Sequence, residues 1–300
     1  TMADQSVCVG VNGQFTGSGT PAALNPYYST NMGVILVETN SGLALGISPG
    51  TATITYTDNH GCTTTANATV NANPTIADGE VCIGNTITMS GTGTPASSNP
   101  YISMNTGLAT VTNSGVVTGI SSGNTTIKYT DNHGCMAIAA LAVHSLPVVL
   151  GLEVCIGESK SMGYVGVPAA SNAFVSSNPS VATVTITGLV TGISAGSANI
   201  TFTDNHGCTA TAVVTVNSGP TVNIAGTDAS CTSDDNKIVI GQSATLTAVG
   251  GPFTTIFWNN NLGSGSPKTV TPLGTTTYTV TVGDSHGCTA TANIQISVIP

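Results

Sequence analysis

The sequence contains no arginine and only four lysines, and charged residues make up 6% of its 300 residues. An ordinary soluble domain contains about 25%. Four cations cannot neutralise a row of phosphates, so we expect no nucleic-acid partner. No apolar run approaches the roughly 18 residues of a membrane-spanning helix, so we also expect no membrane span.

Aromatic residues are scarce as well, at 4%, and the hydrophobic fraction of 40% is slightly low. Small polar residues replace the missing charge: the chain has 36 glycines and about fifty threonines. Threonine, valine and isoleucine favour strands, whereas strong helix formers are few. The composition therefore predicts an all-β protein, and the many β-branched residues argue against disorder.

Eight cysteines form two series that repeat along the chain. The first series, mostly in a V-C-[VI]-G motif, is Cys8, Cys82, Cys155 and Cys231. The second series, at the end of a D-[NS]-H-G-C motif, is Cys62, Cys135, Cys208 and Cys288. Neighbours within a series are 73 to 80 residues apart. Such a period indicates tandem domains of about 75 residues each.

The predicted domains are residues 1–74, 75–147, 148–220 and 221–300, and the last one diverges in sequence. Linker prolines end the first three domains, at Pro74, Pro147 and Pro220. The chain starts just after the position of such a proline and ends on another, so copies could follow one another without a break. We therefore expect one four-domain unit of a longer polypeptide or of stacked subunits. A segment cut at domain boundaries is the alternative.

Each repeat shows short segments in which apolar and polar residues alternate, as in residues 181–202. Glycine-containing turns separate these segments. About seven strands in 75 residues is typical of an immunoglobulin-like sandwich. The D-N-H-G stretch is predicted to be a hairpin turn, because Asp and Asn bond their own backbone and Gly adopts a positive φ.

The run of residues 176–203, which includes G-L-V-T-G-I-S-A-G, resembles bacterial Ig-like domains of group 2. That family occurs in tandem in surface adhesins of the intimin and invasin type. Residues 41–57 and 113–130 match the same run more loosely. Residues 257–298 instead resemble Ig-like repeats of very large secreted Bacteroidota proteins, including gliding and surface adhesins. The resemblance implies four tandem Ig-like sandwiches in an elongated rod at the bacterial cell surface.

Regularly spaced cysteine pairs in such a chain indicate structural disulfides and a secreted or extracellular protein. Zinc is the less favoured interpretation, because zinc sites usually need clustered Cys and His ligands. In the family alignment, the first-series cysteine lies near the C-terminal pole of its domain and the second-series cysteine near the N-terminal pole. A strand of eight residues spans roughly 25 Å, and a disulfide needs Cα atoms within about 7 Å.

The resemblance thus favours bonds between neighbouring domains: Cys8 with Cys135, Cys82 with Cys208, and Cys155 with Cys288. Cys62 and Cys231 would then link successive units. The alternative pairs the two cysteines within each domain: Cys8 with Cys62, Cys82 with Cys135, Cys155 with Cys208, and Cys231 with Cys288.

An Asp-His pair recurs in every D-[NS]-H-G-C motif: Asp58/His60, Asp131/His133, Asp204/His206 and Asp284/His286. Such a pair could orient a general base, but a triad also needs a positioned nucleophile. The pairs lie one domain apart and cannot converge on one site. We interpret them as turn residues, and we give His144 the same structural interpretation as a linker residue.

Two groups in the fourth domain allow a binding role. Asp228, Asp234 and Asp235 could hold Ca²⁺, although their spacing favours a solvated loop. Phe257 and Trp258 could form a platform for sugar, although a core tryptophan is more usual.

We therefore expect no enzyme, no catalytic residue, no cofactor and no metal site. The favoured function is structural: a four-domain unit of a disulfide-stiffened surface filament or adhesin stalk that associates with itself head to tail. The alternative is a glycan- or partner-binding module of a larger secreted adhesin or enzyme. Near-identical repeats favour the first, and only the fourth domain hints at the second.

Overall fold

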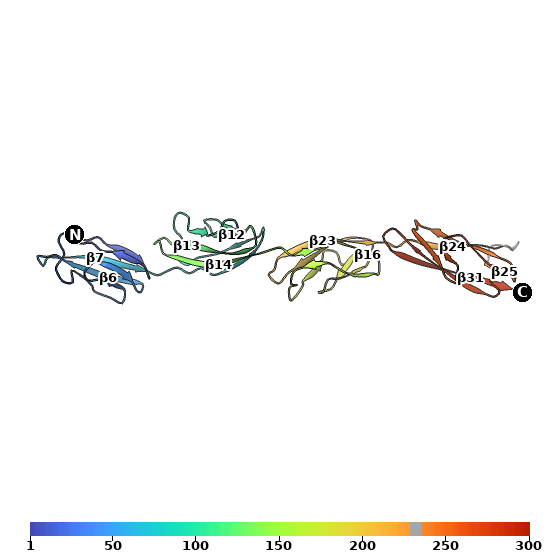
Figure 1. The fold of residues 1–300 in the computed structure, drawn as a ribbon, viewed down its shortest axis with the longest axis horizontal. Coiled ribbons are helices and arrows are strands. Elements are labelled where there is room, and N and C mark those ends of the chain that lie inside the picture. Colours follow the sequence, from blue (N-terminus) through green and yellow to red (C-terminus); the bar gives the residue numbers. More distant parts are fainter. Residues whose placement is uncertain (229–235) are drawn as a thin grey trace. The chain divides into compact units, whose positions relative to one another are not determined.

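The computed structural model describes residues 1–228 and 236–300. These residues form strands and loops, and none of them lies in a helix (Figure 1). Accordingly, the described part of the chain has no helix that could cross a membrane. The chain divides into two compact units, Thr1–Leu146 and Pro147–Pro300. Each unit contains two β-sandwiches, so the predicted all-β class with four immunoglobulin-like sandwiches is confirmed.

The first sandwich consists of a four-stranded sheet and a three-stranded sheet. The larger sheet has the order β1 (Gln5–Cys8), β7 (Thr63–Asn71), β6 (Gly50–Thr57) and β3 (Tyr27–Ser29). The smaller sheet has the order β2 (Asn12–Gln14), β5 (Leu43–Gly46) and β4 (Ile35–Val37). Strand β1 runs parallel to β7, and the long β6–β7 hairpin is antiparallel.

The second sandwich repeats this plan. Its four-stranded sheet has the order β10 (Tyr101–Ser103), β13 (Gly123–Thr130), β14 (Met136–His144) and β8 (Gly79–Cys82). Its three-stranded sheet has the order β11 (Ala109–Val111), β12 (Val116–Gly119) and β9 (Thr86–Thr88). The first strand, β8, again runs parallel to the last, β14.

The third sandwich has the same two sheets and one small addition. The four-stranded sheet has the order β16 (Leu152–Cys155), β23 (Thr209–Asn217), β22 (Gly196–Thr203) and β19 (Phe174–Ser176). The three-stranded sheet has the order β17 (Ser159–Ser161), β21 (Leu189–Gly192) and β20 (Ala182–Val184). A short ribbon of β15 (Val148–Val149) and β18 (Tyr164–Val165) precedes β16 and β19 respectively.

The fourth sandwich diverges at its start. Strand β24 (Val222–Asp228) joins β26 (Ala244–Gly250) and β29 (Lys268–Val270) in a three-stranded sheet. A five-stranded sheet has the order β25 (Lys237–Val239), β31 (Thr289–Ile299), β30 (Thr276–Gly283), β27 (Thr255–Trp258) and β28 (Gly263–Ser264). The parallel partner of the last strand is therefore β25, which begins six residues after Cys231.

The sequence alternation is that of strands with one buried face. In β6, Ala52, Ile54 and Tyr56 are buried, whereas the threonines between them face outward. The buried residues of the four cores span residues 7–70, 81–143, 154–216 and 238–296. Outward threonine hydroxyls thus take the place that charged side chains hold on most protein surfaces.

Candidate functional site

One disulfide joins the two sandwiches of the first unit. Cys8, the last residue of β1, bonds Cys135, which precedes β14, and their Cα atoms are 5.6 Å apart. The two residues are 127 positions apart in the sequence. The bond therefore connects neighbouring sandwiches, as the interdomain pairing predicts.

The second unit contains the equivalent bond. Cys155, at the end of β16, bonds Cys288, which precedes β31, and their Cα atoms are also 5.6 Å apart. The alternative pairing within single domains is therefore wrong. Each of its four bonds needs a cysteine that is already bonded elsewhere, namely Cys8, Cys135, Cys155 or Cys288.

The other four cysteines are in different states. Cys82 and Cys208 are each disulfide-bonded, and their predicted bond to one another, which would join the two units, stays a prediction. Cys62 is free and exposed. Cys231 lies outside the described residues, so its predicted link to Cys62 of another copy also stays a prediction.

An aspartate four residues earlier holds each second-series cysteine. In the first sandwich, Asp58 Oδ1 accepts hydrogen bonds from the backbone N–H of His60 at 2.8 Å and of Cys62 at 2.9 Å. Gly61 has a φ of 79°, in the left-handed region that glycine adopts freely. The same pairs of bonds, at 2.8–2.9 Å, surround Asp131, Asp204 and Asp284. The Asp-His pairs thus form the predicted turns, and each aspartate binds backbone N–H groups.

This turn gives a prediction on pH. The N–H groups of Cys62 and His60 hold the pKa of the Asp58 carboxyl below its ordinary value. The carboxylate therefore stabilises the folded turn fully above the ordinary pKa of about 4, and this contribution is lost as the pH falls through the lower, folded pKa. We expect Asp58→Asn to reduce the acid sensitivity of the first sandwich. Thermal unfolding between about pH 2 and about pH 7 checks this, and an unchanged pH dependence would contradict it.

The parallel pairing of the first strand with the last strand determines which residue of the last strand lies opposite the first-series cysteine. Cys8 lies opposite Asn71 in this register. In the fourth sandwich the same register sets Val239 opposite Ile299. Val239 therefore takes the place of Cys8 at the end of this strand, and Cys231 itself lies outside the described residues. Nine residues separate Cys231 from Gly241, whereas one residue separates Cys8 from Gly10, and Val239, eight residues after Cys231, ends the strand.

Polar side chains surround the Cys155–Cys288 bond. Glu153 Oε2 lies 3.1 Å from His286 Nδ1 and accepts a hydrogen bond of 3.0 Å from Asn217 Nδ2. These two contacts, His286 first, hold the pKa of the Glu153 carboxyl below its ordinary value. Both side chains are more than half exposed, so their contact contributes little to stability. The sequence analysis missed this contact, although Glu153 and His286 each precede their cysteine by two residues.

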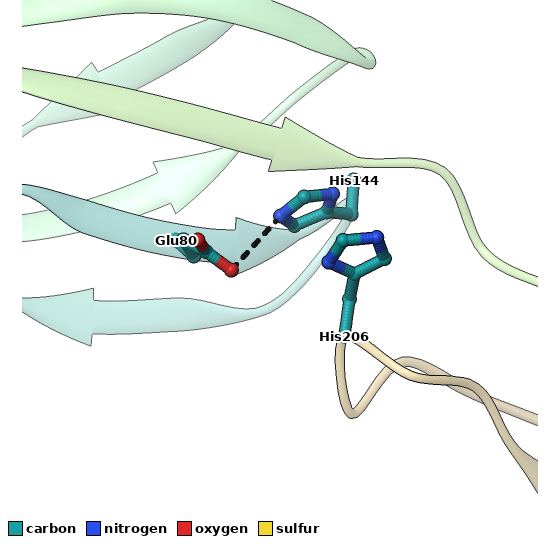
Figure 2. Close-up of side chains that lie close together, drawn as sticks. All are labelled: Glu80, His144 and His206. Atoms are coloured by element: carbon teal, nitrogen blue, oxygen red, sulfur yellow. Dashed lines mark hydrogen bonds and ion pairs between the residues drawn. The ribbon is translucent and has the colours of Figure 1, made fainter. Parts of the chain in front are cut away.

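The second sandwich has a related pair on its own strands. Glu80 of β8 and His144 of β14 lie side by side, with Oε2 and Nε2 3.2 Å apart (Figure 2). His144 is therefore the last residue of a strand rather than a free linker residue. His206, also drawn in Figure 2, belongs to the second unit, where its backbone N–H donates to Asp204 Oδ1 at 2.9 Å.

The aromatic pair of the fourth sandwich separates. Trp258 is fully buried, and its Nε1–H donates to the carbonyl of Gly265 at 3.0 Å, so it is the predicted core tryptophan. Phe257 points outward and is 59% exposed. Asp234 and Asp235 lie outside the described residues, as does the side chain of Asp228, so the calcium interpretation stays untested.

Comparison with known families agrees with this architecture. Residues 69–139 and 166–216 match the family of bacterial Ig-like domains of group 2. The two matched segments lie one after the other along the chain, mainly in the second and third sandwiches, and each is similar to that family. Such domains with disulfides between them are typical of proteins outside the cytoplasm. A search of curated proteins gives no match.

Among solved structures, the chain is similar to fragments that contain several domains in a row. One is an eight-domain immunoglobulin fragment of the Down syndrome cell adhesion molecule, at 14% identity and a TM-score of 0.31. The alignment covers 99% of this chain and 48% of that fragment, so the chain spans about half of its length. Another is Drosophila N-cadherin EC1-4, at 11% identity, 99% coverage of both chains and a TM-score of 0.25.

Proposed function

We propose that this chain is a structural unit of an extracellular filament or adhesin stalk on a bacterial cell surface, in which disulfides stiffen a rod of Ig-like domains. The observation that carries the proposal is that the disulfides connect neighbouring sandwiches. Cys8–Cys135 and Cys155–Cys288 each join one sandwich to its neighbour. A module that only needed stability would gain as much from bonds within each domain.

Two physical effects support this role. A domain of about 75 residues buries a small core and is marginally stable by itself. A bond that closes a loop of 127 or 133 residues adds about 4–5 kcal/mol in the chain-entropy model. The same bond also holds two sandwiches in one mutual orientation, which a flexible linker cannot do.

Self-association completes the proposal. Cys62 ends a turn that is equivalent to the turns of Cys135 and Cys288 in other sandwiches. Cys62 is exposed, whereas Cys135 and Cys288 are each 1% exposed. The free turn presents the surface that its counterparts use to contact a preceding sandwich. We propose that another copy of the chain supplies that sandwich, head to tail.

Electron microscopy of the oxidised protein tests the proposal. We expect concentrated samples to contain fibres whose repeat equals the length of four sandwiches, and dilution to shorten them. Sedimentation at the same concentrations measures the assembly in solution. Isolated particles at every concentration would contradict the structural proposal.

One observation favours a second candidate function, the binding of neutral glycans. A hollow of about 460 Å³ lies beside Phe257 and includes Thr255 and Ser264 in its lining. An exposed ring flanked by hydroxyls suits the apolar face and the hydroxyls of a sugar. Binding of neutral oligosaccharides that Phe257→Ala abolishes and Phe257→Tyr keeps would support this function, and equal binding by all three proteins would exclude the site.

A further inference from the structure

The fourth sandwich differs from the others at the strand end that carries the interdomain cysteine. Cys8 lies opposite Asn71, and Val239 lies opposite Ile299 in the same register. The local backbone is also the same. In the first sandwich, the N–H of Val9, the residue after the strand, donates to the carbonyl of Asn71 at 3.1 Å. In the fourth sandwich, the N–H of Ile240 donates to the carbonyl of Ile299, also at 3.1 Å.

The turn that follows confirms the equivalence. The N–H of Gln242 bonds the carbonyl of Val239 at 2.9 Å, and the N–H of Glu158 bonds the carbonyl of Cys155 at 3.0 Å. The glycines inside these turns have φ values of 88° and 81°. Val239 therefore holds the position from which Cys155 bonds the next sandwich.

The exchange changes the chemistry of this pole. In the third sandwich, Cys155 is bonded to Cys288, and the carbonyl of Asn217 contacts the Cys288 sulfur at 3.9 Å. In the fourth sandwich, Val239 takes the position of Cys155, and Ile299 takes the position of Asn217. These two side chains are 41% and 44% exposed, and the adjacent Ile240 is 57% exposed. Three aliphatic side chains thus lie at a place that forms a covalent junction elsewhere in the chain.

The first sandwich presents the other half of such a junction. The turn that ends in Cys62 has the hydrogen bonds of the turns that end in Cys135 and Cys288, with 2.8–2.9 Å from each cysteine N–H to its aspartate. Its thiol is free and exposed. A reduced cysteine packs as a small apolar group.

We propose that these two ends meet between copies, with the Cys62 turn of one copy packed on Val239, Ile240 and Ile299 of the preceding copy. This inference rests on the proposed head-to-tail assembly and specifies its joint. The joint inside each compact unit is closed by a disulfide, whereas the joint between copies is apolar, non-covalent and reversible. The occupant is a second copy because the surface continues the pattern of the interfaces already formed at Cys8 and Cys155.

The small contact explains why the joint would be reversible. Burial of apolar surface contributes about 25 cal/mol per Å², and stable interfaces bury roughly 800 Å² per partner. A pole with three part-exposed aliphatic side chains buries a smaller area than this. The assembly should therefore lengthen as the protein concentration rises and shorten on dilution.

The test restores the missing cysteine. In the Cys231→Ser background, Val239→Cys should produce, under oxidising conditions, a ladder of multimers on non-reducing gels that collapses on reduction. Peptide mapping should find the introduced cysteine bonded to Cys62. Adding Cys62→Ser should remove the ladder, and Val249→Cys, a matched control on the 39% exposed Val249 of the same sandwich, should give no bond to Cys62.

The outcomes separate the joint from the assembly. If copies associate in sedimentation but Val239→Cys gives no bond to Cys62, the joint is wrong and the head-to-tail proposal can stand. A bond between Cys62 and Cys231 of two unmodified copies would overturn the reversible joint. If neither association nor crosslinking occurs at any concentration, both proposals fail.

Discussion

The Cys155→Ser, Cys288→Ser double variant is expected to lose about 4–5 kcal/mol of unfolding free energy in the second unit, because the bond closes a loop of 133 residues. Its two sandwiches should also lose their fixed orientation. Denaturant unfolding followed by the fluorescence of Trp258 measures the first effect, since this is the single tryptophan of the chain. Small-angle X-ray scattering of the isolated second unit, if it folds alone, or of the full chain measures the second.

Glu153→Gln serves as the matched control for this variant. It replaces the carboxylate that contacts His286 and keeps the Cys155–Cys288 bond. Because both side chains of this contact are more than half exposed, we expect little change in either measurement. A double serine variant with the stability and scattering profile of the parent would contradict the stiffening role of the disulfide.

Trp258→Ala is expected to destabilise the fourth sandwich by about 3–5 kcal/mol, because it removes a fully buried indole and leaves a cavity. It also leaves the carbonyl of Gly265 without the indole N–H. The fourth sandwich contains Lys237 and Lys268, so its unfolding exposes two sites for trypsin. Limited trypsin digestion read by mass spectrometry should show early cleavage at these lysines in the variant.

Trp258→Phe provides the control, since it keeps a large apolar ring and removes only the indole hydrogen bond and part of the volume. We expect its cleavage at Lys237 and Lys268 to be slower than in Trp258→Ala. Equal resistance of the alanine variant and the parent would show that Trp258 is not central to the stability of this core.

The fold followed from short-range patterns. Alternating residues such as Ile54 and Tyr56 bury one face of a strand, and the D-N-H-G-C stretch contains every atom of its own turn, from the Asp58 carboxylate to Gly61. Local patterns of this kind need no knowledge of distant residues. The disulfide partners, by contrast, followed only once the resemblance supplied the direction of the first strand.

The sequence by itself determined the four-fold repeat, the all-β class and the turn that holds each second-series cysteine. Only the tertiary structure decided which residue of the fourth sandwich ends the strand that runs parallel to its last strand. Cys231 belongs to the same series as Cys155 by spacing, and the register against Ile299 places Val239 at the end of the strand. The physical reason is that parallel pairing joins residues about sixty positions apart, so the register against the last strand, and not the spacing of the cysteines, sets the strand end. The tertiary structure also shows what takes the place of the missing charged residues, because threonines face outward from the sheets.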